Sequence, residues 1–314
     1  MSDLKKLETL LGGDVDTAFQ IITTSSGGDM PAVFNAILPN FMAYIPDEKR
    51  MSLSWDLTDM ITDATYEGRA LNLTSSFYMT NDPSLGNCFT FNHINGSAVY
   101  NLSQLATAGE LKVRLNVQSR EYLAWCETEG INVYIHAVGS SIFYESVPYA
   151  IVAGGEDSIQ LTKSTLKLLA GYYGKCARGI QDAQSYYFPG DYAVDGCYRS
   201  CYQDVCLSTC GCMDPSYVRE QGVDACTITQ MGCVQNMTKW RGDPSRWPEC
   251  RCPQPCQEQD FEYDVSRFLY DSQKACLDPL NTTASGMCKT DVASVRISFS
   301  SMVVLMQVEV PVLS

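Results

Sequence analysis

Cysteine density constrains the fold of this chain more than any other feature of its sequence. The 314 residues include 15 cysteines, and eleven of these fall between Cys176 and Cys256. A reducing cytosol would not normally sustain a block of this density, so the pattern indicates an oxidising compartment and a framework of disulfides.

Potential glycosylation sites point to the same compartment. A single N-x-S/T sequon is often a chance match, but five sequons together with the cysteine block favour a secreted protein or an ectodomain. The sequence therefore predicts N-linked glycans at Asn72, Asn95, Asn101, Asn236 and Asn281.

The spacing of four cysteines predicts two cross-links in the block. Cys197 and Cys201 are four residues apart in a helical segment, 195–205, so their thiols share one face about 6 Å apart along the axis. Cys250 and Cys252 are two apart in an extended, proline-flanked segment, which places them on one side about 6.6 Å apart. If the segments run antiparallel, the spacing predicts a rod with three nested bridges, Cys197–Cys252, Cys201–Cys250 and, at its outer end, Cys176–Cys256.

Two further bridges are expected around the turn of this rod. Their pairing is left open by the spacing, and they use Cys210, Cys212, Cys226 and Cys233. Zinc is the alternative, because CxC and CxxxC spacings also occur in metal clusters. The chain has only two histidines, His93 and His136, and both lie far from the block, so disulfides are favoured and no metal or cofactor is expected.

Composition excludes several other function classes. The chain carries 36 acidic and 22 basic residues, a net charge of −14, which would repel nucleic acid. A hydrophobic content of 45% is enough for a globular fold. No nucleophile elbow, set of zinc-ligand histidines or phosphate-binding glycine loop is present, so we expect no catalytic residues and no enzyme activity.

Periodicity predicts an α+β fold. Helical spacings occur in the first 85 residues, at Leu4–Leu11, from Asp29, and after a potential N-cap at Ser54 through Trp55, Met60, Ile61 and Ala64 to Gly68. Apolar residues then alternate with polar ones at 111–117, 131–135, 261–265 and 295–299. This alternation predicts a half-buried antiparallel sheet built from strands far apart in the sequence.

The sequence has no recognisable membrane or secretion signal. No stretch approaches the roughly 20 apolar residues of a membrane helix, and residues 1–30 lack a signal-peptide pattern. Because an oxidised, sequon-bearing chain must still be exported, we expect a fragment whose flanking segments carry the targeting and the membrane helices.

Five motifs follow one another along the chain: Gly86-Asn-Cys-Phe-Thr-Phe-Asn92, Gly174-Lys-Cys176, Cys197-Tyr-Arg-Ser-Cys201, Cys210-Gly-Cys-Met-Asp-Pro215 and Cys250-Arg-Cys-Pro-Gln-Pro-Cys256. In their order and spacing they resemble the degenerin, epithelial sodium channel and acid-sensing ion channel family, and the resemblance covers about residues 50–300. It implies an ectodomain of several subdomains, with an antiparallel palm and β-ball, a helical finger and a disulfide-rich helical thumb. The implied regions are a finger-like helical region at 1–86, palm strands at 87–130, a β-ball-like region at 131–157, palm strands and the loop to the thumb at 158–175, the thumb at 176–256, and palm strands with a knuckle-like loop at 257–314.

The resemblance also implies a function. Members of the family are trimeric, sodium-permeable and typically amiloride-sensitive channels, so the expected partners are related subunits in a homo- or heterotrimer, the plasma membrane through flanking helices, and a matrix or peptide ligand. By resemblance, Tyr173, with Tyr172, lies in the loop that couples the thumb to the pore, and the five thumb bridges follow the family topology. The alternative is a secreted cysteine-rich binding module that conducts nothing.

Several residues depart from the family pattern. Ala64 and Leu71 stand where acid-sensing members carry a cysteine pair. Cys88, Cys126 and Cys206 have no assigned partner, whereas Cys276 and Cys288 are expected to close a local loop. The stretch between Cys233 and Cys250 is strongly acidic in acid-sensing members, but here it carries Lys239, Arg241 and Arg246 against Asp243 and Glu249. Mechanical, peptide or constitutive gating is therefore favoured over gating by protons.

Overall fold

The structure is a computed structural model that describes residues 38–39, 42–43, 45–122, 128–143, 146–171, 174–270 and 291–308. Its helices are α4 Asp47–Leu53, α5 Leu57–Met60, α6 Leu73–Ser76, α7 Val194–Cys210 and α8 Met231–Arg241, with 3-10 turns η1 Ala106–Gly109, η2 Ser119–Glu121, η3 Ile180–Asp182 and η4 Pro244–Arg246. Its strands are β1 Ile61–Tyr66, β2 Arg69–Ala70, β3 Phe77–Asp82, β4 Gly86–Phe91, β5 Leu111–Asn116, β6 Ile131–Val133, β7 Tyr149–Ile151, β8 Gly155–Lys167, β9 Gln257–Leu269, β10 Val292–Phe299 and β11 Leu305–Val308. The two helices predicted before residue 38 lie outside the described residues.

A seven-stranded sheet dominates the described part of the chain. Its order is β11-β8-β10-β5-β1-β2, and β9 pairs with the other edge of β8. The alternation at 111–117 and 295–299 is confirmed by β5 and β10, which pair antiparallel with Val113 opposite Val295. Two smaller antiparallel hairpins, β3–β4 and β6–β7, pack beside it. The α+β class predicted from the sequence is therefore confirmed.

The prediction of a purely antiparallel sheet is wrong for two strand pairs. β8 runs parallel to β10 and to β11, and only its pairing with β9 is antiparallel. The chain reverses once between β8 and β9 and again before β10, which enters on the opposite edge of β8. Alternation of apolar residues defines the buried face of a strand but not its direction, so the sequence pattern did not reveal this crossover.

The helix predicted from Trp55 to Gly68 is also wrong. Ser54 follows the end of α4, Asp56 caps the short α5 by accepting a hydrogen bond from the backbone of Leu57, and the chain then enters β1. The register of β1 against β5 shifts between Ile61 and Asp63, as in a β-bulge. The extra residue places Ile61 and Ala64 on one buried face although they are three apart. This spacing therefore imitated a helix.

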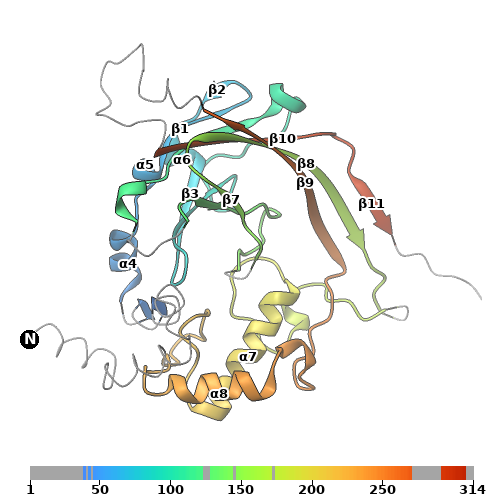
Figure 1. Cartoon of the computed structure of the whole chain (residues 1–314). Coiled ribbons are helices and arrows are strands. Elements are labelled where there is room, and N and C mark those ends of the chain that lie inside the picture. The colour runs from blue at the N-terminus through green and yellow to red at the C-terminus, as the bar shows by residue number, and fades with distance from the viewer. Residues whose placement is uncertain are drawn as a thin grey trace, which may run out of the picture.

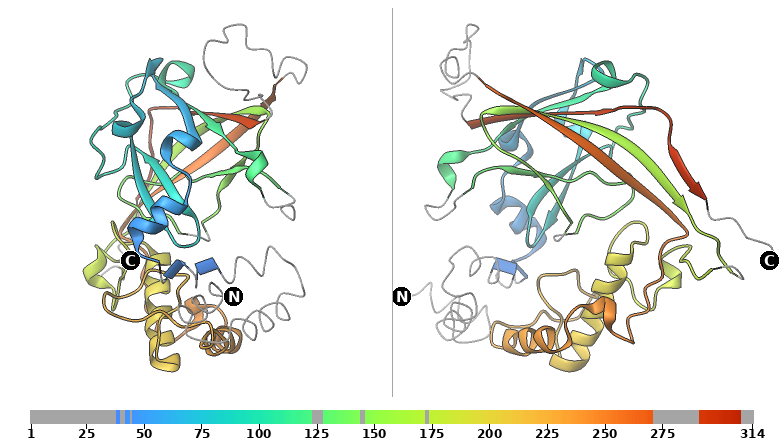
Figure 2. Two further views of the ribbon diagram at one scale, coloured as in Figure 1. Left: turned by 90° about the vertical axis from the view of Figure 1, so that its left-hand side faces the viewer. Right: turned by 45° about the vertical axis from the view of Figure 1, so that its right-hand side comes forward.

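The main core lies under the sheet, where Ile151, Ile159 and Ala293 are fully buried. Figures 1 and 2 show β8 and β9 leaving this core together as a long arm that leads to α7 and α8 at the other end of the molecule. Along this arm β9 is exposed at nearly every position, including Val265. The half-buried alternation predicted for 261–265 is therefore wrong in burial, because β9 covers the edge of β8 and every position of β9 except Phe261 is exposed.

Candidate functional site: a disulfide-braced hairpin on two long strands

The candidate site is the hairpin formed by residues 176–256 at the end of the β8–β9 arm. The 17-residue helix α7 ends at Gly211, whose φ of 74° is a left-handed conformation that glycine adopts without strain. Three bridges tie α7 and its entry to the returning segment 250–256. They join the cysteines that the spacing brings together, as Cys176–Cys256, Cys197–Cys252 and Cys201–Cys250.

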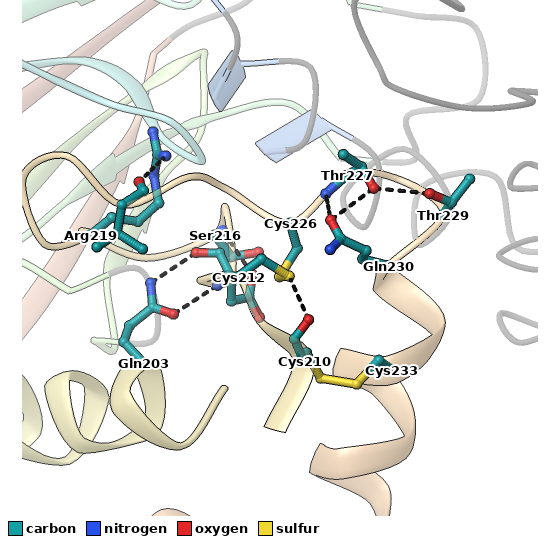
Figure 3. Close-up of a disulfide and its surroundings, with 12 residues drawn as sticks. Gln203, Cys210, Cys212, Ser216, Arg219, Cys226, Thr227, Thr229, Gln230 and Cys233 are labelled. Carbon is teal, nitrogen blue, oxygen red and sulfur yellow. Dashed lines mark hydrogen bonds between the residues drawn. A yellow bond between two sulfur atoms is a disulfide. The ribbon is translucent and has the colours of Figure 1, made fainter. Parts of the chain in front are cut away.

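The end of the hairpin that lies away from β8 and β9 carries two more bridges, shown in Figure 3. The structure pairs Cys210 with Cys233 and Cys212 with Cys226, a choice that the spacing alone left open. The first bridge joins the last residue of α7 to the first turn of α8, and the second closes the loop between the two helices. Around them, Val205, Val234 and Met237 form a small buried core.

Buried polar contacts hold the turn that follows α7. The fully buried amide of Gln203 accepts a hydrogen bond from the backbone N–H of Asp214 (2.8 Å) and donates to the Asp214 and Val218 carbonyls (2.9 and 3.2 Å). The hydroxyl of Tyr202 donates to the Asp214 carboxylate (2.9 Å). Burial, followed by the charge of Asp214, raises the pKa of the Tyr202 phenol, which therefore stays protonated as a donor. These contacts hold the turn in addition to the Cys212–Cys226 bridge that encloses it.

A second polar cluster closes the end of α8. The guanidinium of Arg241 lies 4.3 Å from the ring centre of the buried Trp247 and pairs with Glu249. The indole N–H of Trp247 donates back to the Arg241 carbonyl (3.0 Å). This cluster positions the segment that leads into Cys250 and Cys252.

The base of the hairpin is bonded directly to the strands of the arm. The backbone N–H of Leu168, just after β8, donates to the Cys256 carbonyl (2.9 Å), and the Cys256 N–H donates to the Ala177 carbonyl (2.7 Å). Strand β9 starts at the next residue, Gln257. With the Cys176–Cys256 bridge at the same point, the base of the hairpin is joined directly to β8 and β9.

The hairpin also contacts the loop between β6 and β7. The backbone N–H of Asp191 donates to the Gly139 carbonyl (2.9 Å), and Arg199 of α7 stacks on the ring of Phe143 at 4.3 Å. A Cβ on Gly190 would lie only 2.1 Å from the Gly139 oxygen, so this close approach requires glycine. The hairpin is thus held at two places, its base and this loop.

At the other end of the arm, a carboxylate is buried in the core. Asp157 on β8 is fully buried, and neither oxygen has a hydrogen-bond partner among the described residues. Its nearest cation is Arg267 on β9, whose Nε lies 3.8 Å from Oδ1. Burial raises the pKa of Asp157, and the Arg267 charge and the Tyr149 hydroxyl offset this rise only in part. Asp157 therefore loses its proton less readily in the folded chain than a free aspartate does.

The predicted residues fall into three groups. Asn72, Asn95, Asn101 and Asn236 are exposed. Among the described cysteines, Cys88 and Cys206 form no bridge, and burial raises their thiol pKa values to about 11 and about 12. The remaining residues lie outside the described part of the chain. They are the tyrosines predicted to couple the thumb to the pore, three cysteines and one glycosylation site: Tyr172, Tyr173, Cys126, Cys276, Cys288 and Asn281.

The described part of the chain lacks two other features. It has no cluster of three or more histidine, cysteine or acidic side chains arranged to hold a metal ion. None of its helices combines the length and the apolar character needed to cross a membrane.

The mixed sheet and its five-bridge hairpin define a disulfide-rich α+β domain. A family model described as amiloride-sensitive sodium channel matches residues 18–314. The chain therefore belongs to the amiloride-sensitive sodium channel family, which confirms the resemblance carried by its motifs.

Individual relatives agree with the family model. The chain is 28% identical over 238 residues to degenerin mec-10 of Caenorhabditis elegans, an alignment that covers 74% of this chain and 32% of the relative. It is 29% identical over 243 residues to the degenerin-like protein unc-105 of the same organism, covering 73% and 27% of the two chains. The degenerin-like protein asic-1 is 27% identical over 229 residues, covering 71% and 28%. The chain thus spans about a third or less of each of these relatives.

Proposed function

We propose that this chain is the extracellular domain of a subunit of a trimeric, sodium-permeable and typically amiloride-sensitive cation channel. It transmits an extracellular stimulus, which is mechanical, a peptide or protons, to a pore formed by segments beyond this chain. Its partners are related subunits in a homo- or heterotrimer, and it faces the outside of the plasma membrane. Membership of the sodium channel family supports this function over that of a secreted binding module.

The observation that carries the proposal is the attachment of the hairpin to the sheet. The base of the hairpin is fixed by the Cys176–Cys256 bridge and by backbone hydrogen bonds to the end of β8. Because five bridges prevent the hairpin from bending internally, a force or ligand acting on it moves β8 and β9 as a unit. This is the property required of a lever.

The subdomain assignments belong to the same proposal. The hairpin at 176–256 is the thumb, the seven-stranded sheet is the palm, and the β6–β7 hairpin lies in the β-ball-like region. In this arrangement Tyr173, with Tyr172, connects the lever to the pore. In the sequence they lie between the end of β8 and Cys176.

The test is electrophysiology on the full-length subunit, expressed in oocytes alone and with related subunits. We expect a sodium current that amiloride blocks and that responds to pressure, a peptide or a pH step. Tyr173→Ala should abolish the response to the stimulus while the amount of protein at the cell surface is unchanged. Tyr78→Ala, at a half-buried tyrosine of β3 that lies outside the β8–β9 arm, is the matched control and should respond normally.

Two results would contradict these assignments separately. A full-length subunit that reaches the cell surface but conducts no sodium in any combination would overturn the channel function. Normal gating of Tyr173→Ala would remove only the coupling role of that tyrosine.

A further inference from the structure

Trp240 is the most exposed large apolar side chain in the described part of the hairpin. It is 91% exposed and lies near the end of α8, whereas Trp247, seven residues later, is 4% exposed. The apolar face of α8 is formed by Met231, Val234 and Met237, which are buried against α7. Trp240 therefore belongs to the outward face of the helix, where an uncovered indole is unfavourable.

The same outward face carries a sequon. Asn236 lies four residues before Trp240 on α8 and is exposed. Residues four apart on a helix are neighbours, with Cβ atoms about 5–6 Å apart. Helical side chains lean toward the N-terminus, so Trp240 and Asn236 lie on the same side of α8, with the indole on the side of Trp240 that is nearer to Asn236. Thr238 completes the acceptor pattern Asn236-Met-Thr238.

We propose that Asn236 carries an N-linked glycan whose first N-acetylglucosamine stacks on the indole of Trp240. The donor is a lipid-linked oligosaccharide in the secretory compartment. The amide nitrogen of Asn236 loses a proton and bonds to the anomeric carbon, while the bond from that carbon to the lipid diphosphate breaks and the diphosphate leaves. Transfer occurs before α8 folds, when the Thr238 hydroxyl does not yet donate to the Val234 carbonyl.

The surroundings of Trp240 fit a sugar better than a protein partner. A stable protein interface buries about 800 Å² on each side and has an apolar centre. On α8, Trp240 is the only large apolar side chain exposed among the described residues, and it lies between Lys239 and Arg241. The indole of Trp240 provides one flat apolar surface, which is what the C–H face of a single sugar requires. The charged neighbours remain in water.

The glycan has a consequence for assembly. Figures 1 and 2 place α8 at the edge of the molecule, on the far side of the hairpin from the sheet. A glycan on its outward face keeps that face in solvent, so contacts with other subunits must use other faces of the hairpin. The inference depends on export of the chain, but it does not depend on ion conduction.

The test uses the secreted chain from cells that add high-mannose glycans, with Asn72, Asn95, Asn101 and Asn281 changed to Gln so that Asn236 is the only acceptor. Mass spectrometry of the glycopeptide measures occupancy, and acrylamide quenching of tryptophan fluorescence measures exposure of the indole. A peptide N-glycosidase, which removes the whole glycan, should raise the quenching attributable to Trp240 about two-fold or more, as expected from the loss of one stacking contact. An endoglycosidase that leaves the first sugar should not change it.

Trp240→Phe provides the reference for the contribution of the other tryptophans, and Asn236→Gln should match the fully deglycosylated protein. A chain that keeps Asn101 as its only sequon is the matched control, and neither enzyme should alter its quenching. An unoccupied Asn236, or the same quenching after both enzymes, would overturn the stacking. Either result leaves the channel proposal intact, because no current is measured.

Discussion

The hairpin and the sheet are stabilised in opposite ways. The hairpin has a small core around Val205 and Val234, and five bridges close loops whose ends are 14 to 80 residues apart. The sheet has a large apolar core, and its central pairing of Val113 with Val295 is held by hydrogen bonds and burial alone. One region is specified by covalent links and the other by packing.

This difference teaches which part of the molecule can move. A bridged hairpin has few internal arrangements, because each bridge removes conformations from the unfolded and partly folded chain. Strands held by side-chain packing can shift relative to one another at a lower cost. A stimulus that reaches the hairpin is therefore expected to rotate it as a body and to shift the paired strands β8 and β9 relative to β10.

The largest expected effect comes from removing the two bridges between α7 and the returning segment 250–256. Changing Cys197, Cys201, Cys250 and Cys252 to Ser should lower the free energy of unfolding of the hairpin by about 4 kcal/mol or more, since each bridge contributes about 2–4 kcal/mol. Hydrogen exchange should rise in α7 and in residues 249–256, whereas β5 and β10 should stay protected. Cys88→Ser is the matched control, because Cys88 forms no bridge with any described cysteine. Equal loss of protection in the sheet would show that the two regions do not fold independently.

The reverse experiment attacks the core of the sheet. Ile159→Ala removes a fully buried side chain of β8 and should lower the free energy of unfolding by about 3 kcal/mol, as for other large-to-small core substitutions. Chemical denaturation followed by hydrogen exchange should locate the loss in β5, β8 and β10. Gln160→Ala, at the exposed neighbouring position, should have little effect. A loss of protection confined to the hairpin would contradict the comparison.

The sequence predicted the hairpin better than the sheet, for a physical reason. Cys197 and Cys201 on a helix and Cys250 and Cys252 on an extended segment have matching separations, so two local periodicities determined which residues face each other. The pairing of Cys210 and Cys212 was not predictable in this way, because a turn of irregular shape separates them from their partners.

The failures in the sheet have equally specific causes. Ile61 and Ala64 imitated a helix because a register shift placed them on one face. Alternation did not reveal that β8 and β10 are parallel. The burial of Asp157 could have been predicted, because Asp157 is two residues from both Gly155 and Ile159 and lies on the same buried face of β8.

Two polar residues of the hairpin had no signal in the sequence. Gln203 and Arg199 find their partners in irregular loops, which no periodic pattern describes.

A smaller effect is expected from the polar contacts inside the hairpin. Gln203→Ala leaves the backbone N–H and carbonyl of Asp214 without their partner and should cost about 2 kcal/mol, because unpaired buried polar groups are expensive. Thermal unfolding with all bridges intact measures the loss. Gln184→Ala, a loop residue that does not order this turn, should change the unfolding temperature much less. An unchanged unfolding temperature for Gln203→Ala would mean that sulfur alone maintains the hairpin.

The smallest expected effect, and the only one that depends on pH, concerns Asp157 in the sheet. Its pKa is raised in the folded state, so its contribution is most favourable when the carboxyl is protonated and is lost as the pH rises through the folded pKa. Asp157→Asn, which does not titrate, should therefore gain stability relative to the natural protein as the pH increases from below 3.8, the ordinary value for this carboxyl, to 7. The expected gain is about 1 kcal/mol, which is modest among point substitutions because Arg267 already compensates part of the charge.

Arg267→Gln should have the opposite effect, because it leaves the ionised Asp157 without its nearest cation. The variant should lose stability at pH 7 and recover it on acidification, when the carboxyl is protonated. Thermal unfolding of the three proteins between pH 3 and 7 provides the measurement. Parallel pH profiles would mean that Asp157 keeps an ordinary pKa in the folded state. The stability of each variant relative to the natural protein should change in opposite directions as the pH rises. That result would show that protonation of Asp157 alters the stability of the packed sheet, at the strands to which the bridged hairpin is attached.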